Sequence, residues 1–292
     1  MKQKLKIGFI ALCDSASLIV AHERGFFTQE GLQVDLVREP SWANIRDKLA
    51  FGLLDAAHML APMLIEASLG AGNVHMPLTT GFALSSGGGR ITLAKEMDRE
   101  RPRLAMVYPF SSHHYALRQY TAANGLDAEL VVLPPTQMIA ALSSGQIQGF
   151  CAGAPWGLLA ETLGLGLDVV SYSLPGRMEK VLGVRQTWLD ASSEAHTGLM
   201  RALRAASQWT NRPENRGEVA EILARTEYLN APADVIASGL ADIDFTANRP
   251  SIEEGRWYLD RMVEYGQIHA LQNTGPILAD LFRVATFDEI IF

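Results

Sequence analysis

Residues 39–62 contain the first side chains whose types and spacing suggest a chemical role. Ser41 is a good N-cap for the helix that we expect to follow it. The first turn of that helix presents free backbone N–H groups beside the ring of Trp42, which suits a small anion. The apolar residues of the helix recur on one stripe, at Ile45, Leu49 and Leu53. An ordinary strand–helix–strand unit, in which Trp42 fills a gap in the core, explains the same pattern equally well.

His113 and His114 are the only adjacent pair among the seven histidines of the chain. Two neighbouring histidines on one loop make a poor chelate, so a polar loop at a helix start is the preferred interpretation and no metal site is predicted. His113 is still a candidate hydrogen-bond donor in a cleft. The sequence has neither a Gly-x-Ser-x-Gly motif nor a phosphate-binding loop. We therefore predict no catalytic residues and no cofactor.

Three further candidates depend on where the chain places them. Residues 85–89 are glycine-rich but precede a strand, so a hinge or a close backbone approach to a ligand is preferred to phosphate binding. Trp156 follows the expected strand 149–152, at the sheet edge where ligands of α/β proteins bind, although packing between lobes is an equal alternative. Lys180 falls in an expected loop and, by its residue type alone, is a solvated surface lysine.

The composition argues against two classes of partner. The net charge of −7 over 292 residues does not fit direct nucleic-acid binding. No apolar run reaches the roughly 18 residues of a membrane span. The apolar run 7–12 is too short for a signal-peptide core, so we expect a cytoplasmic protein, or a periplasmic one if a leader has been removed. Cys13 and Cys151 fit no metal spacing, and two buried free thiols are preferred to one long-range disulfide.

Alternating strand and helix patterns organise the chain into two units. The first unit has expected strands at 4–12, 32–38 and 56–60 and helices at 15–24, 41–53 and 62–69. The second has strands at 104–108, 129–133 and 149–152 and helices at 114–124 and 137–144. This order predicts parallel sheets covered on both faces. The region after residue 192 reads as helical and can pack back on the first unit, which gives lobe 1 as 1–95 plus 190–292 and lobe 2 as 96–189.

Four sequence blocks carry a resemblance to a known family: SWANIRDKL…LDAAHMLAP, LPPTQMIAAL, GFCAGAPW and ASQWTNRPENR. Together they resemble the nitrate- and bicarbonate-binding proteins of bacterial ABC importers, and equally the cytoplasmic nitrate/nitrite sensors that share their fold. The resemblance runs in order from residue 5 to residue 267. It implies an α/β, type II periplasmic-binding-protein fold, in which two lobes close on a small anion in the cleft between them.

The resemblance also implies roles for particular residues. The aromatic wall of the family falls on Trp42, its cleft histidine on His113, and the lysine that neutralises the anion on Lys180. A lysine there favours nitrate or nitrite over bicarbonate, because the bicarbonate branch uses an acidic residue at that place together with a metal. Gly89 departs from the glutamine of nitrate binders, with Arg90 as a candidate to compensate. Ala154 departs from a family glutamate.

These observations lead to one functional expectation. The protein binds nitrate or nitrite reversibly as a cytoplasmic sensor that controls a regulatory partner, such as an RNA-binding antiterminator protein. The alternative is the receptor of an ABC-type nitrate importer that docks on an ABC permease. An enzyme of the same fold is the third hypothesis, disfavoured because no nucleophile–base pair stands out. The candidate ligand-binding residues are Trp42, Gly89, Arg90, His113, Trp156 and Lys180.

Overall fold

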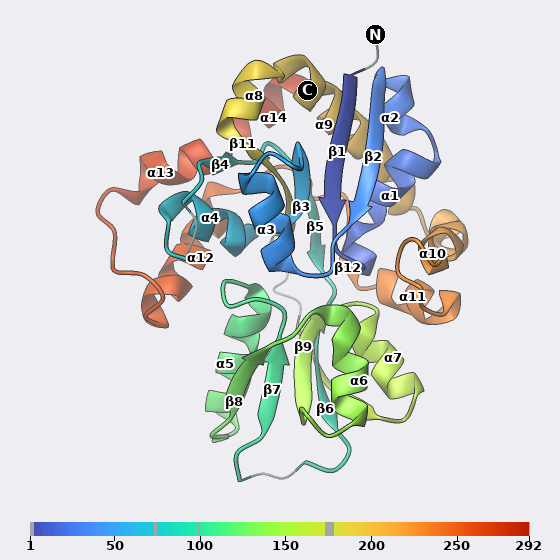
Figure 1. Ribbon diagram of the computed structural model, residues 1–292, viewed down its shortest axis with the longest axis vertical. Coiled ribbons are helices and arrows are strands. Elements are labelled where there is room, and N and C mark those ends of the chain that lie inside the picture. The colour runs from blue at the N-terminus through green and yellow to red at the C-terminus, as the bar shows by residue number, and fades with distance from the viewer. Residues whose placement is uncertain (1–2, 73–74, 98–99, 173–177, 292) are drawn as a thin grey trace.

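The computed structural model describes residues 3–72, 75–97, 100–172 and 178–291, and these form two α/β lobes (Figure 1). The sheet of the first lobe has the strand order β12-β5-β11-β3-β1-β2, with β4 beside β11. Strands β1, β2 and β3 are parallel, and β11, β5 and β12 join them in antiparallel pairs. Their bounds are β1 (Gln3–Phe9), β2 (Leu32–Arg38), β3 (Ala56–Leu60), β4 (Leu78–Thr79), β5 (Ala83–Gly87), β11 (Met178–Arg185) and β12 (Ile243–Asp244).

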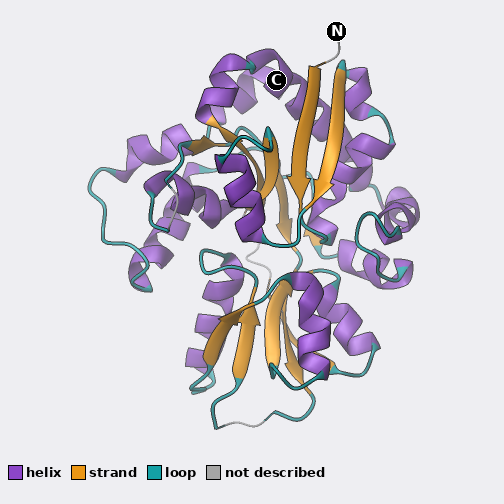
Figure 2. Cartoon of the chain, in the orientation of Figure 1, coloured by secondary structure: helices purple, strands orange, loops and turns teal. Residues whose placement is uncertain are grey.

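The sheet of the second lobe has the order β10-β6-β9-β7-β8. Its strands are β6 (Gly89–Ala94), β7 (Arg103–Met106), β8 (Glu129–Val132), β9 (Gly149–Gly153) and β10 (Gly166–Tyr172). Figure 2 shows helices on either side of these strands. They are α5 (Ser112–Ala123), α6 (Met138–Ser143), which follows the 3-10 turn η2 (Pro135–Gln137), and α7 (Trp156–Thr162).

The helices of the first lobe come from both ends of the chain, as the blue-to-teal and the yellow-to-red segments of Figure 1 show. From the N-terminal part come η1 (Cys13–Ser15), α1 (Ala16–Glu23), α2 (Phe26–Gln29), α3 (Trp42–Ala50) and α4 (Ala61–Leu69). From the C-terminal part come α8 (Gln186–Ala191), α9 (Ser193–Thr210), η3 (Pro213–Asn215), α10 (Arg216–Ala224), α11 (Ala233–Leu240), α12 (Ile252–Glu264), α13 (Thr274–Leu281) and α14 (Val284–Ile291). None of the helices in the described ranges is long and apolar enough to cross a membrane.

Several local predictions are confirmed. The Ser41 side chain caps α3 by accepting a hydrogen bond from the Asn44 amide at 3.3 Å. Helix α4 ends at Gly70, whose left-handed conformation, with φ of 66°, releases the chain from the helix. Cys13 and Cys151 are both free and buried. Local residue chemistry therefore specifies the start of α3 and the end of α4, whereas α3 ends at Ala50, before the expected Leu53.

Two strands lie in a different sheet from the one that the expected lobe bounds imply. The expectation placed residues up to 95 in lobe 1 and 96–189 in lobe 2, yet β6 belongs to the second sheet and β11 to the first. The chain leaves the first sheet at Gly87 and Gly88, which have φ of 82° and 78°. A Cβ atom on Gly87 would lie 2.5 Å from the Asp242 carbonyl oxygen. The glycine-rich segment thus approaches the backbone at Asp242 closely, rather than a ligand, at the point where the chain passes from the first sheet to the second.

The core of the first lobe also holds an unpaired histidine. His196 in α9 is fully buried, with the ring of Trp188 edge-on at 6.4 Å. Within the described residues, neither of its ring nitrogens has a hydrogen-bond partner. Burial lowers the pKa of His196 to about 4. His196 is therefore harder to protonate in the folded protein than in the unfolded chain, where a histidine has its ordinary pKa.

We predict that His196 makes the protein less stable in mild acid. Its folded-state pKa is depressed, so the free energy of unfolding should fall as the pH drops from about 6.5 towards 4, by up to about 1.4 kcal/mol per pH unit. Urea unfolding at several pH values in this range should show that the free energy of unfolding depends less on pH in His196→Leu than in the wild type. The matched control is the exposed His269, because His269→Leu should leave this pH dependence unchanged. Parallel curves for the wild type and His196→Leu would contradict the prediction.

Candidate functional site

A buried cluster of charged side chains lies where the two lobes meet. Lys180 Nζ on β11 lies 2.8 Å from Asp14 Oδ2 in η1. His58 Nε2 on β3 lies 3.2 Å from Asp14 Oδ1. All three side chains are at most 2% exposed. A lysine almost never occupies such a position without a partner, because removing an unpaired charge from water is costly.

The register of the first sheet explains how these residues meet. Lys180 stands opposite Leu60 on β3, and Leu182 stands opposite His58. Side chains two residues apart on a strand share a face of the sheet, so Lys180 and His58 project on the same side. Strand β1 runs parallel to β3, and its carboxyl end leads directly into η1 with Asp14. Lys180 and His58 thus meet on one face of the sheet, and Asp14 reaches them from just beyond the carboxyl end of β1.

The charges in this cluster stabilise one another. Burial alone would raise the pKa of Asp14, but the Lys180 charge, followed by the close contact with His58, holds it well below its usual range. Burial alone would lower the pKa of Lys180, but the charges of Asp14 and Glu179 raise it instead. Burial lowers the pKa of His58. The pair of Asp14 and Lys180 is therefore ionised in the folded protein, and His58 is neutral at pH 7.

The second lobe contributes the start of α5. Ser111 caps this helix by accepting a hydrogen bond from the His114 amide at 3.1 Å. Ser112 Oγ donates to a carboxylate oxygen of Glu179, whose other neighbour is Lys180 at 3.9 Å. His113 is buried, and burial, followed by the Lys180 charge, lowers its pKa to about 3. The helix start thus places a neutral imidazole against the charged cluster of the first lobe.

Trp42 forms an aromatic wall of the same region. Its side chain is fully buried at the start of α3, with its ring centroid 5.3 Å from that of His58. The Lys180 ammonium lies 6.0 Å from the Trp42 ring. Its indole N–H has no hydrogen-bond partner among the described residues, which is unusual for a tryptophan that only fills a core.

Unpartnered polar atoms gather around the Lys180 ammonium. In the part of the chain that the structure describes, several buried polar atoms near it lack a hydrogen-bond partner: Trp42 Nε1, His113 Nδ1, Ser85 Oγ, both ring nitrogens of His58, Asp14 Oδ1 and Glu179 Oε1. Ser85 is placed there by its position opposite Lys180 in the pairing of β5 with β11. Buried polar groups are nearly always satisfied, and the indole N–H of Trp42 and the hydroxyl of Ser85 are donors beside a cation for which an acceptor is missing. The arrangement is suited to a small anion with several acceptor oxygens.

The structure therefore brings together three of the six sequence-predicted residues, namely Trp42, His113 and Lys180. The expectation that Lys180 is a solvated lysine in a loop is wrong, because it is 1% exposed within strand β11. Its neighbours Asp14, His58, Glu179 and Ser85 were missed. Asp14 follows the end of a buried strand, whereas His58, Ser85 and Glu179 lie within buried strands, so a polar residue in or just after an apolar run was their one signal in the sequence.

The other three predicted residues lie at the lobe interface instead. Arg90 forms an ion pair with Asp242 of the first lobe. Trp156 Nε1 donates to the Ala11 carbonyl at 3.1 Å, which is the packing alternative for this residue. Gly89 pairs with Gly153 in the second sheet. A Cβ atom added to Gly153 would lie 3.2 Å from Asp14 Oδ2. Gly89 thus stays near the cluster through its backbone, whereas the side chains of Arg90 and Trp156 have other partners.

Further hydrogen bonds hold the lobes together around the cluster. Arg46 Nη1 of α3 donates to Tyr108 Oη at 2.7 Å, and Tyr108 Oη donates in turn to Glu66 Oε2 at 3.2 Å. Gln267 Nε2, which follows α12, donates to the Pro109 carbonyl at 2.8 Å. Tyr115 Oη donates to Gln267 Oε1 at 2.9 Å. The structure is accordingly a closed form, in which the cluster is shielded from solvent.

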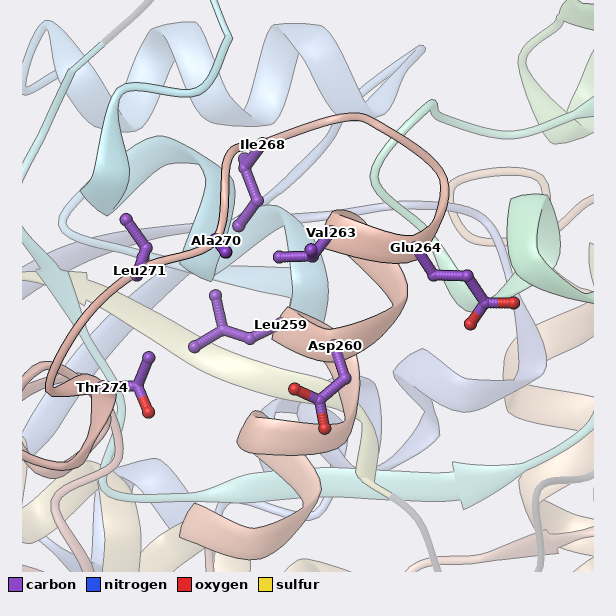
Figure 3. Close-up of a pocket in the computed structure, with 8 residues that line it drawn as sticks. All are labelled: Leu259, Asp260, Val263, Glu264, Ile268, Ala270, Leu271 and Thr274. Atoms are coloured by element: carbon purple, nitrogen blue, oxygen red, sulfur yellow. The ribbon is translucent and has the colours of Figure 1, made fainter.

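A separate groove runs along α12 and the segment after it (Figure 3). Its lining is mostly apolar, with two carboxylates and no basic side chain: Leu259, Asp260, Val263, Glu264, Ile268, Ala270, Leu271 and Thr274. Such a lining does not attract an anion. Within the described residues, no group of three or more histidine, cysteine, aspartate or glutamate side chains is placed to hold a metal ion. The cluster around Lys180 is thus the candidate site.

Comparison with known proteins places this geometry in context. Residues 1–224 match the NMT1-like family. The chain is 33% identical to the bicarbonate transport ATP-binding protein CmpC of Synechococcus elongatus, over 98% of this chain and 49% of that protein. It is also 33% identical to the nitrate import ATP-binding protein NrtC of Synechocystis, over 99% of this chain and 50% of that protein. The chain thus spans about half the length of these curated relatives.

The fold agrees closely with a solved structure. The crystal structure of the periplasmic nitrate-binding protein NrtA from Synechocystis superposes with a TM-score of 0.92 and 26% identity, covering 99% of this chain and 88% of that one. This match confirms the predicted periplasmic-binding-protein fold of two α/β lobes.

We predict that Lys180→Met destabilises the protein by about 3–5 kcal/mol, because it leaves the buried Asp14 carboxylate without a cation. Without Lys180, the pKa of Asp14 rises above its unfolded value, so the loss relative to the wild type should grow as the pH increases from 5 to 8. The double variant Asp14→Asn/Lys180→Met should recover most of the loss. Urea unfolding at both pH values tests this. A loss that is equal at pH 5 and pH 8, with no recovery in the double variant, would refute it.

Proposed function

Because this chain belongs to the NMT1-like family, we propose that it reversibly binds a small oxyanion, nitrate or nitrite, between its two lobes. The observation that carries the proposal is the buried Lys180 ammonium with unpartnered donors around it, from Trp42, Ser85 and His113. An anion bound among these groups would accept their hydrogen bonds, and the Lys180 ammonium would balance its negative charge. A buried anion needs both, since an unpaired charge away from water is strongly disfavoured.

The chemistry of the donors favours an ion that only accepts hydrogen bonds. Nitrate and nitrite carry acceptor oxygens and no donor, and the indole N–H and the imidazole N–H can only donate to them. The hydroxyl of Ser85 adds a third donor, and the flat ring of Trp42 supplies a wall for a planar ion. Gly89 stands where nitrate binders have a glutamine. Arg90 is a poor substitute for that glutamine, because its guanidinium pairs with Asp242. Ser85 is the better substitute donor.

The donors come from both lobes, so binding should be coupled to closure. Trp42, Ser85 and Lys180 lie on the first lobe, whereas His113 lies on α5 of the second. An anion held by both groups stabilises the closed arrangement relative to an open one. Closure around a ligand by hinge motion is the usual way in which such a two-lobe protein turns binding into a change of surface.

A binding role is supported over catalysis by the state of the nearby thiol. Burial, reinforced by the Glu179 charge, raises the pKa of Cys151 well above its ordinary value. The thiolate is the nucleophilic form of cysteine, so a pair of Cys151 with His113 is not activated. The neutral His113 is better placed to donate a hydrogen bond than to exchange protons at pH 7.

For the biological role, we infer a cytoplasmic sensor whose closure controls a regulatory partner, with an antiterminator protein as the candidate. The similarity to a portion of two ATP-binding proteins supports a cytoplasmic location, since ATP is used there. The structural match to a periplasmic nitrate-binding protein supports the alternative, a receptor that docks on an ABC permease. Cell fractionation, followed by affinity capture with and without nitrate, separates the two. Recovery in the periplasm together with a permease would replace the sensor role.

We predict that isothermal titration calorimetry will show saturable binding of nitrate or nitrite and little response to bicarbonate. Asp14→Asn/Lys180→Met should fold and lose the response, because the pair is removed together and no lone buried charge remains. The matched control is Lys4→Met, which breaks the exposed pair of Lys4 with Asp35 and should bind as the wild type does. Undiminished nitrate affinity in the double variant would rule out Lys180 as the ligand contact.

A further inference from the structure

The closed site already contains a counterion for its lysine. Asp14 Oδ2 lies 2.8 Å from Lys180 Nζ, and both side chains are almost completely buried. His58 lies on the other carboxylate oxygen at 3.2 Å. On the side of the second lobe, an added Cβ at Gly153 would lie only 3.2 Å from Asp14 Oδ2. The carboxylate is therefore confined from several directions and cannot move far from the ammonium.

An anion that binds Lys180 must share it with this carboxylate. Two negative charges would then flank one positive charge in a space shielded from water, where charges interact strongly over a few ångströms. The pair of Asp14 and Lys180 is neutral as a unit, so the entering anion finds a much weaker field than a lone ammonium would provide. The neutral state of His58 and His113 offers no replacement charge.

We propose that Asp14 sets the anion affinity of this site by acting as an internal counterion that competes with the ligand for Lys180. This inference rests on the proposed function and deepens it. Asp14 has two opposing effects: it keeps Lys180 charged and stable in the empty protein, and it weakens the hold of the site on the ligand. The consequence is a site that is stable when empty and responds to a higher anion concentration than Lys180 alone would require.

The other groups that face the lysine do not carry the same effect. Glu179 lies farther from Lys180 Nζ, at 3.9 Å, and its carboxylate is engaged by the Ser112 hydroxyl. Cys151 is a buried thiol whose raised pKa keeps it neutral. The remaining neighbours are the neutral rings already described: His58 on β3, His113 on α5 and Trp42 on α3. Asp14 is thus the carboxylate in direct contact with Lys180.

The test compares nitrate affinity in the wild type and in Asp14→Asn by calorimetry between pH 6 and pH 9. At pH 6, the variant should bind nitrate at least about 10-fold more tightly, because the competing charge is gone. Its affinity should fall as the pH rises, since Lys180 loses the carboxylate that raises its pKa and must be protonated to bind. The wild type should show little change over this range. A purely structural role of Asp14 would produce neither the gain nor the new pH dependence.

Two further variants keep the result interpretable. Glu23→Gln is the matched control, because it removes a carboxylate from an ion pair on the outer side of the first lobe, 2.7 Å from Arg225, and should leave the nitrate affinity unchanged. Asp14→Ser offers a smaller side chain with room for water beside Lys180, and should show the same gain if Asp14→Asn folds poorly. If both Asp14 variants unfold without nitrate, excess nitrate should restore folding, and failure to do so counts against the proposal.

The possible outcomes separate this inference from the proposed function. Binding by the wild type with equal or weaker binding by both Asp14 variants would overturn the counterion role and leave anion binding intact. Nitrate binding by the Asp14 variants, with none by the wild type, would support the counterion role, because the Asp14 carboxylate would then prevent binding altogether. Absence of binding in the wild type and in both Asp14 variants would overturn both proposals.

Discussion

A lysine with almost no exposure to water must be compensated, and this constraint organises the centre of the molecule. The Lys180 ammonium lies on a strand whose two neighbours are also buried, so no route to solvent relieves it. The compensation comes from Asp14, at the carboxyl end of the first strand, with His58 supporting that carboxylate. Three elements that are distant in the sequence must therefore fold together before the charge is tolerable.

The second lobe completes this arrangement without duplicating it. Its α5 helix supplies a hydroxyl to Glu179 and a neutral imidazole beside the ammonium, and its Trp156 donates a hydrogen bond to the Ala11 carbonyl, just after β1. The chain reaches this lobe through two glycines that no larger residue can replace without strain. These polar contacts lie beside apolar ones, because one cluster of buried apolar side chains includes residues of both lobes, among them Tyr115 and Trp156 of the second.

The sequence predicted local features far better than it predicted the site. The bounds of β3 and the Ser41 cap follow from nearby residues, and both are confirmed. Strand β11 was missed because Glu179 and Lys180 interrupt its apolar pattern, and only the distant Asp14 makes a buried lysine acceptable there. Strand register decides which polar side chains share a face, and a single sequence without homologues does not reveal register. Residue chemistry alone had assigned Lys180 to the surface, and the resemblance to a family is what made it a predicted ligand contact; the structure shows it buried.

The central claim is that a small anion makes direct contact with Lys180 in the space between the lobes. A crystal structure of the wild-type protein grown with nitrate tests this most directly. The expected result is a nitrate oxygen within about 2.7–3.2 Å of Lys180 Nζ, with Trp42 Nε1 and His113 donating to the other oxygens. Nitrate bound elsewhere, with the contact between Asp14 and Lys180 unchanged and the orphaned donors still unpaired, would contradict the claim.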